Sequence, residues 1–237
     1  MEYIVILLIL ILSLIIAFFT FSINIKKIKK VVKNDKLDKL VSKFPENKQI
    51  CEKILKNLDN TKVKIKEDNS NEKQTSLYIA ISDTIFIANI KNSYTRIQTI
   101  AHECLHSIQD RRLLIFNFIY SNIYLIYFIL SIILTIFRVY TNYNLQIIIL
   151  IIMGFIYYLI RSHLEMDAMT KAKYVAKDYI EEYIKDNPVC AKEEVKELSN
   201  EYEKINNIGI PATNVLLFFN CIIKVVSYVI VVAIMTL

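Results

Sequence analysis

Two histidines and a glutamate stand at a spacing that can hold a metal ion and use it. His102, Glu103 and His106 form the pattern His-Glu-x-x-His. Residues four apart project from one face of a helix, so both imidazoles can reach a single ion. A zinc ion in such a site lowers the pKa of a water at its open position to about 7. Glu103 would then take the proton of this water as it attacks an amide carbonyl.

Coincidence is a weak explanation for this motif. It contains two of the three histidines in the chain, and a shuffled chain of this composition would contain it on the order of two times in a thousand. We therefore predict that one Zn²⁺ ion binds His102 and His106 and that Glu103 is the general base. Cys104 lies inside the motif at a variable position, and we interpret it as a packing residue.

A catalytic zinc ion also needs a third protein ligand. Three candidates follow one another closely further along the chain, namely His163, Glu165 and Asp167. On a regular helix, His163 and Asp167 share one face and Glu165 points roughly opposite, so all three cannot be ligands together. The residues alone leave the choice between Glu165 and Asp167 open.

The motif must be carried by an amphipathic helix. Ser93 is a suitable N-cap, and no Gly or Pro follows before Asp110. The predicted apolar side of this helix consists of Ile97, Ile100, Ala101, Leu105 and Ile108.

Smaller elements precede the motif helix. Apolar residues at roughly helical spacing among lysines predict an amphipathic helix over residues 25–40, and a second helix is expected over residues 45–58. The apolar period then changes to two in residues 63–65 and 77–81, with a polar turn over residues 68–71 between them. We predict a small β-hairpin from these two stretches.

The chain is 54% hydrophobic with two Gly and no Trp, which points away from a soluble globule. The apolar residues form four blocks nearly free of charge: 4–23, 113–137, 145–160 and 212–237. The third block would rise only about 24 Å, less than the roughly 30 Å hydrocarbon core, so it must use Tyr143 or Arg161 at its ends or lie in a thinned bilayer. We predict four spans.

Lysine distribution predicts the orientation of these spans. The first block lacks a preceding basic segment and a cleavage site, so we interpret it as a retained anchor. Eight Lys lie between Lys26 and Lys43, whereas only Arg138 lies between the second and third blocks. Because basic residues near spans stay in the cytoplasm, we expect both termini outside the plasma membrane and the motif on the cytoplasmic side. The second and third blocks then return the chain to that side at Arg161.

The region after the third block is predicted to be helical. Residues 162–185 continue the helical pattern directly, and Asn187 and Pro188 break the chain before a helix over residues 191–206. The net charge of +6 is explained by a lysine-rich face against anionic lipid, so no nucleic-acid partner is expected.

Together these observations predict a mainly α membrane protein with four transmembrane helices and a small cytoplasmic α+β, zincin-like metallopeptidase module. The expected segments are an N-terminal membrane anchor (1–23), cytoplasmic helices with the β-hairpin and the motif helix (24–112), a transmembrane helical hairpin (113–160), cytoplasmic helices with the third zinc ligand (161–211) and a C-terminal transmembrane helix (212–237).

Three stretches resemble the zinc-dependent membrane peptidases of the YugP type, also called neutral zinc metallopeptidases. They are residues 77–81, residues 101–109 reading AHECLHSIQ, and residues 164–168 reading LEMDA. The order of the four apolar blocks is also similar, so the resemblance covers nearly the whole chain. It implies that Glu165 is the third zinc ligand and that Asp167 is a neighbouring carboxylate that orients a ligand imidazole.

Some residues depart from related patterns. Leu105 stands where the YugP-type family commonly has Gly, and Met169 stands where it has a small polar residue. These two differences affect the expected packing around the site more than the expected metal. Prenyl-protein and heat-shock-type membrane peptidases place a second carboxylate at the position of Met169, so they fit less well. Intramembrane site-2 peptidases bury the motif within a span. Arg96 and Asp110 flank it here, so we expect it at the cytoplasmic surface.

The predicted partners are a peptide or membrane-protein substrate and the lipid bilayer. A non-catalytic zinc-binding scaffold or sensor is the competing interpretation, but such a protein would have no need of Glu103. Lys224 lies near the middle of the last block, where it could serve a function or pack against a polar group. Neither the substrate nor the oligomeric state follows from the sequence.

Overall fold

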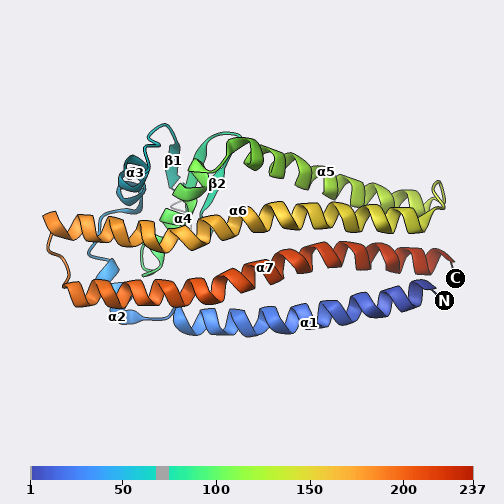
Figure 1. Ribbon diagram of the computed structural model, residues 1–237, viewed down its shortest axis with the longest axis horizontal. Helices are drawn as coiled ribbons and strands as arrows, with labels where there is room; N and C mark the ends of the chain where they lie inside the picture. The colour runs from blue at the N-terminus through green and yellow to red at the C-terminus, as the bar shows by residue number, and fades with distance from the viewer. Residues whose placement is uncertain (1, 68–74, 237) are drawn as a thin grey trace. The chain divides into compact units, whose positions relative to one another are not determined.

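The computed structural model describes residues 2–67 and 75–236, and most of these residues are helical. The elements in the described part of the chain are α1 (Glu2–Val31), α2 (Asp35–Val41), α3 (Asn47–Asn57), β1 (Lys64–Glu67), β2 (Leu77–Ile79), β3 (Thr84–Ile87), α4 (Arg96–Ile108), α5 (Arg111–Ile136), α6 (Tyr143–Asp186) and α7 (Lys192–Thr236) (Figure 1).

The chain forms two compact units. The first, here called the apolar unit, consists of Met1–Ile25, Phe116–His163 and Pro211–Leu237. The second, here called the α/β unit, consists of Lys26–Ile115 and Leu164–Ile210. Each unit has its own buried core.

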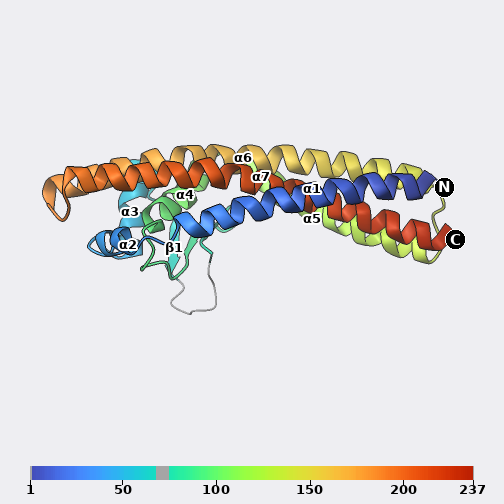
Figure 2. The same cartoon turned by 90° about the horizontal axis from the view of Figure 1, so that it is seen from below.

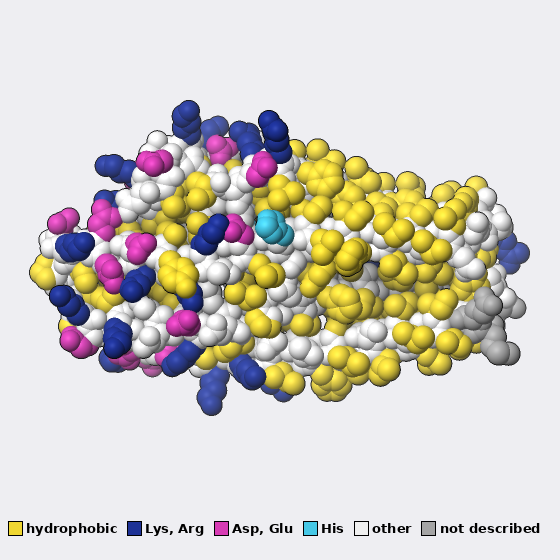
Figure 3. All heavy atoms as spheres, viewed as in Figure 1, with side chains coloured by type: hydrophobic (Ala, Val, Ile, Leu, Met, Phe, Trp, Pro, Cys, Tyr) yellow, Lys and Arg dark blue, Asp and Glu magenta, His cyan; other side chains and the backbone are white. Residues whose placement is uncertain are grey.

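The apolar unit contains segments of α1, α5, α6 and α7. These four helices are long and apolar enough to cross a membrane, and each contains one of the predicted apolar blocks. Aromatic and aliphatic residues of α5, α6 and α7 form the core, among them Tyr124, Leu150 and Tyr228. Many large hydrophobic side chains remain exposed on the outside of the helices, such as Leu8 and Phe155, and Figure 3 shows them covering the visible face. An exposed surface of this kind indicates a membrane protein.

Several predicted helices merge into longer ones. Helix α6 runs without a break from Tyr143 to Asp186, which confirms that residues 162–185 continue the third apolar block (Figure 2). Helix α7 likewise joins two segments that the sequence suggested were separate, and it does so through Pro211. Proline removes one backbone hydrogen bond from a helix but does not prevent it from continuing when neighbouring helices support it.

The predicted amphipathic helix over residues 25–40 is divided in the structure. Its first part belongs to α1, which ends at Val31, and α2 begins at Asp35. The side chain of Asn34 caps α2 by accepting a hydrogen bond from the backbone N–H of Leu37 at 3.2 Å. An Asn at this position starts a new helix because its side chain satisfies an otherwise unpaired N–H.

The small sheet of the α/β unit differs from the predicted hairpin. Its strand order is β1-β3-β2, in which β3 pairs parallel with β1 and antiparallel with β2. The expected pairing of residues 63–65 with residues 77–81 is therefore wrong. The central strand β3 consists of Thr84–Ile87 and is largely buried, as expected for a short run of β-branched and aromatic residues between two neighbours. The polar turn over residues 68–71 lies outside the described residues.

Helix α4 packs with its apolar side against the core of the α/β unit. Ile97, Ile100 and Leu105 are buried as predicted, but Ile108 at the end of the helix is 46% exposed. The N-cap is Thr95 rather than Ser93, whose backbone carbonyl accepts a hydrogen bond from the N–H of Arg96 at 3.0 Å instead.

The prediction that Arg96 lies at the molecular surface is wrong, because its side chain is fully buried. Its guanidinium donates hydrogen bonds to Asn47 Oδ1 at 3.1 Å and to the backbone carbonyls of Val41 and Phe44 at 2.9 Å each. These acceptors lie on α2, at the start of α3 and in the turn between them. Arg96 thus joins the start of α4 to the first two helices of the α/β unit.

Candidate metal centre

Helix α4 is held against α6 and α7 by a buried amide network. Gln98 donates from Nε2 to Asn206 Oδ1 at 2.9 Å and to the carbonyl of Tyr202 at 3.3 Å. Asn206 in turn donates from Nδ2 to the carbonyl of Met169 on α6 at 2.6 Å. Because Asn206 accepts from Gln98 and donates to Met169, it links the motif helix to the stretch of α6 that follows Leu164.

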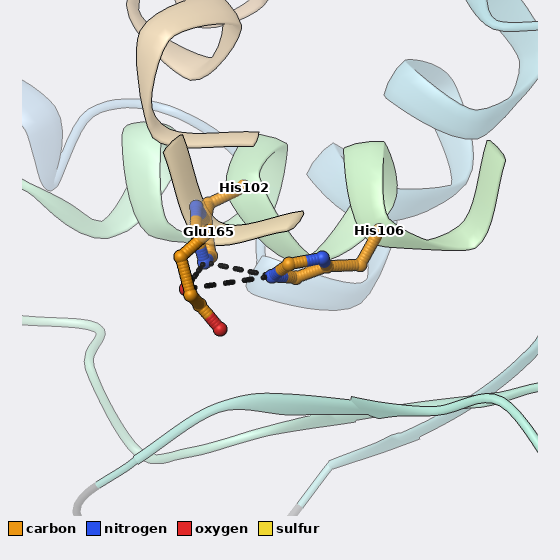
Figure 4. A group of neighbouring side chains, drawn as sticks. All are labelled: His102, His106 and Glu165. Atoms are coloured by element: carbon orange, nitrogen blue, oxygen red, sulfur yellow. Dashed lines mark hydrogen bonds and ion pairs between the residues drawn. The ribbon is translucent and has the colours of Figure 1, made fainter. Parts of the chain in front are cut away.

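This packing brings three metal-ligating side chains together. Figure 4 shows Glu165 of α6 beside the imidazoles of His102 and His106 of α4. The Nε2 atoms of the two histidines are 3.1 Å apart. Glu165 Oε2 lies 3.4 Å from Nε2 of His102 and 3.7 Å from Nε2 of His106.

These distances fit a tetrahedral zinc ion. Zinc binds nitrogen and oxygen ligands at about 2.0–2.2 Å, which places two ligands of a tetrahedron about 3.4 Å apart. The three separations range from 3.1 to 3.7 Å around this value. The donor set of two imidazoles and one carboxylate is also one that catalytic zinc sites use, with a fourth position left open.

Comparison with known proteins does not suggest a function, so the function must be inferred from the side chains of His102, His106 and Glu165. No family model, curated protein or solved structure matches the chain. The resemblance to the YugP-type peptidases rests on the three stretches of sequence quoted above.

Glu103 points into protein rather than solvent, with 6% of its surface exposed. Burial raises the pKa of its carboxyl group above the ordinary value, and the neighbouring charge of Glu165 adds to this increase. His102, His106 and a backbone hydrogen bond with Tyr78 of β2 oppose it. A carboxyl group whose pKa is raised is a stronger base than an ordinary glutamate.

The ring of His106 is oriented by Gln109, a residue to which sequence reasoning gave no role. Nε2 of Gln109 lies 2.8 Å from the carbonyl oxygen of Leu164 and 3.0 Å from Oδ2 of Asp167. Both are acceptors, so the amide NH₂ must face them and Oε1 must face His106, whose Nδ1 is 2.8 Å away. Nδ1 of His106 therefore carries the proton, and Nε2 keeps a lone pair for a metal.

The pKa of His106 is shifted by opposing effects. Burial favours the neutral ring and lowers the pKa. The carboxylate of Glu165, the hydrogen bond to Gln109 and the charge of Glu103 all raise it, and the net result is a pKa above the ordinary value. In the metal-free protein, protons therefore compete for this ring more strongly than for a free histidine.

Asp167 and His163 occupy different surroundings from the three clustered residues. Asp167 reaches His106 through Gln109, and its other oxygen lies 2.5 Å from Nζ of Lys171. His163 is exposed and belongs to the apolar unit. Among the described residues, the metal-ligating cluster consists of His102, His106 and Glu165. Gln109 could have been found from its position, since a residue three after a ligand shares its helical face.

Cys104 lies on the buried side of α4. Its Sγ is 3.6 Å from Sγ of Cys51 on α3, and both cysteines are free and fully buried. The pair fills the contact between α3 and α4 directly behind the motif, consistent with a packing role.

Proposed function

We propose that this protein is a membrane-bound zinc metalloendopeptidase in which His102, His106 and Glu165 hold one Zn²⁺ ion. The convergence of these three side chains at tetrahedral distances is the observation that carries the proposal. It fits the ligand set that the YugP-type resemblance implies. The bound ion would supply a Lewis acid for the attacking water and for the peptide carbonyl.

Glu103 is proposed to move the proton. Its carboxylate is buried beside the imidazoles but lies outside the three-residue ligand cluster, which leaves it available as a base. It would take a proton from the attacking water and pass it to the nitrogen of the leaving peptide. A site that only stored zinc would gain nothing from a buried carboxylate at this point, since burying an unused charge is unfavourable. This argument favours a peptidase over a zinc-binding scaffold or sensor.

The edge strand β2 offers a place for an extended substrate. Among the described strands it pairs with β3 alone, and Leu77 is 39% exposed. Its neighbour Tyr78 makes the backbone hydrogen bond to Glu103, so the strand passes close to the proposed base. Edge strands bind peptides by adding one more strand to the sheet. We therefore propose an unfolded peptide segment as substrate, hydrolysed near β2.

The lysines that follow the first apolar segment support a cytoplasmic location for the α/β unit, which would form the zincin-like module. Four helices able to cross a membrane support a multi-pass protein of the plasma membrane. A peptide or membrane-protein segment exposed at the cytoplasmic surface is then the proposed substrate.

The proposal is tested with Glu103→Gln, a change that keeps the side-chain shape and removes the base. We expect zinc content to remain at the parent level and cleavage of casein, or of a membrane protein that the parent cleaves, to fall about 100-fold to 10,000-fold. Zinc stoichiometry and cleavage rate should be measured on the same detergent-solubilised samples. Cleavage by the variant at the parent rate would refute the role of Glu103. A parent protein that binds zinc stoichiometrically but hydrolyses neither kind of substrate would favour the scaffold.

A further inference from the structure

Lys224 occupies the middle of an apolar helical segment. It lies on α7, thirteen residues after Pro211 and twelve before Thr236. At the rise of an α-helix, both ends of the segment are roughly 18–20 Å away. A lysine side chain cannot span the half-thickness of a hydrocarbon core, about 15 Å, without help from tilt or a partner.

The apolar unit supplies no negative charge for this lysine. Nζ contacts the backbone carbonyl of Asn220 at 3.3 Å, the side-chain oxygen of the same residue, and the ring of Tyr124 at 5.0 Å from its centroid. Within the described residues, no carboxylate forms an ion pair with Lys224. The sequence explains this, because the only acidic residue in the three segments of the apolar unit is Glu2, at the far end of α1.

A hollow lies beside the same tyrosine. It measures about 430 Å³, lies between α1, α5, α6 and α7, and is lined mainly by hydrophobic side chains together with small residues such as Ser13, Gly154 and Cys221. Tyr124 lines it and is 1% exposed, and its hydroxyl has no hydrogen-bond partner among the described residues. A Cβ added to Gly154 would lie 2.7 Å from this hydroxyl, so glycine keeps the helix surface open here.

We propose that this surface, formed by Lys224, Tyr124 and the hollow, binds a transmembrane helix of a partner protein that carries Asp or Glu near its middle. The carboxylate would pair with Lys224, and apolar side chains next to it would enter the hollow. Small residues let helix backbones approach closely in membranes, and polar groups between helices hold them together. A lipid is a poorer occupant, because its charged headgroup lies at the membrane surface and not at the depth of Lys224.

A second copy of this chain cannot be the partner that supplies the charge. Residues 116–163 and 211–237 contain no Asp or Glu, so a homodimer would place two lysines in the membrane without a counter-charge. The partner must therefore be a different protein. This proposal depends on the chain crossing a membrane and not on peptidase activity.

The test uses the full-length protein in vesicles of phosphatidylcholine. The probe is a synthetic single-span peptide of Leu and Ala with one central Glu, labelled for energy transfer, and the matched peptide has Gln instead. We expect the Glu peptide to bind the parent about 3-fold to 30-fold more tightly, the range of interhelical polar interactions. Lys224→Met should lose this preference, and Lys224→Glu should transfer it to a peptide with central Lys. Ile223→Met, an exposed neighbour on α7, should keep it.

Equal binding of the Glu and Gln peptides to the parent would overturn the proposal. So would a preference that survives in Lys224→Met. Oleate provides a third arm, because a fatty acid combines a carboxylate with an apolar chain. Binding of oleate that depends on Lys224, without any preference for the Glu peptide, would make the surface a fatty-acid site. A size-exclusion profile and a helix content equal to those of the parent would show that each variant is folded.

Discussion

Arg96 in the α/β unit and Lys224 in the apolar unit differ in the groups that surround their positive charges. Arg96 in the α/β unit is fully buried and donates to three acceptors from its own unit. Lys224 in the apolar unit is half-buried and contacts only neutral groups, namely Asn220 and a tyrosine ring. The acceptors of Arg96 come from several elements, so this residue holds a fold together. The hydrogen bonds of Lys224 stay within its own helix, and its contact with another helix is the ring of Tyr124 on α5.

The same contrast extends to the other polar groups. In the α/β unit, Gln98 and Asn206 join α4, α6 and α7 by hydrogen bonds, and Gln109 joins His106 to Leu164 and Asp167. In the apolar unit, Tyr124 has an unpaired hydroxyl beside a hollow. The hydrogen bonds of Gln109 help to hold His106 in place. Arg96 Nε and Gln98 Oε1 of this unit nevertheless have no hydrogen-bond partner among the described residues.

The largest effect is expected from removing one of the proposed zinc ligands of the α/β unit. His102→Ala leaves two ligands, so zinc binding and hydrolysis should both be abolished. The control is His163→Ala, which changes the exposed histidine of the apolar unit and should retain zinc. Metal analysis of the purified proteins decides the matter. Loss of zinc from the control as well would place a ligand outside the cluster proposed here.

A second comparison exchanges each buried cation for Met. Arg96→Met removes the donor for Asn47 Oδ1 and the carbonyl of Phe44, whereas the carbonyl of Val41 keeps its hydrogen bond from the N–H of Phe44. Each buried acceptor left without a donor costs about 1–3 kcal/mol, so the free energy of unfolding should fall by about 2 kcal/mol or more. Lys224→Met should leave it unchanged or raise it, because a lysine at the centre of a span is unfavourable by about 2.5–3.5 kcal/mol. Thermal unfolding in detergent measures both. A large loss of stability in Lys224→Met would show that the lysine also supports the fold.

A smaller effect is expected from the amide that orients the metal ligand. Gln109→Leu removes the acceptor for Nδ1 of His106, so zinc affinity should decrease about 10-fold to 100-fold while the fold is kept. Asp167→Ala, one hydrogen bond further from the ring, should have less effect. Chelator competition gives both affinities. An unchanged affinity in Gln109→Leu would show that packing alone fixes the imidazole.

The smallest effect concerns pH. Because the pKa of His106 is raised above its ordinary value, the ring takes up a proton earlier as the pH falls, and only the neutral ring binds zinc. As the pH is lowered, zinc affinity should therefore start to decrease while the pH is still above about 6.5, the ordinary pKa of histidine, and it should continue to decrease at lower pH. Chelator titrations of the parent at several pH values measure this. A decrease that starts only well below that value would mean that the carboxylates near His106 do not act on it as described.

The sequence predicts best what depends on local patterns. The four apolar blocks follow from long stretches nearly free of charge, and the motif helix follows from apolar periodicity; in the described residues all five lie almost entirely in helices. The continuation of α6 beyond the third block was also predictable, since no Gly or Pro interrupts it before Asp186.

Features that depend on contacts between distant segments could not be predicted in this way. The strand β3 was overlooked because its pairing with β1 and β2 is not encoded in its own four residues. Arg96 was taken for a surface residue because a sequence does not show that three carbonyl or amide oxygens surround it. The residues alone also left Glu165 and Asp167 as equal candidates, and the packing of α4 against α6 is what brings Glu165 to the imidazoles.

The unbroken helix α6 fixes the distance along the chain between the third apolar block and Glu165. Glu165 follows the end of the third apolar block at Ile160 by five residues, and the helix continues regularly between them. Along the helix axis this amounts to about 7.5 Å, which is close to the thickness of a lipid headgroup layer. If that block spans the bilayer and the protein is the proposed zinc peptidase, its ligand Glu165 would follow the span by little more than one helical turn, close to the membrane surface. Peptide bonds far out in the cytoplasm would then be cleaved only after their chain is drawn down to the headgroups.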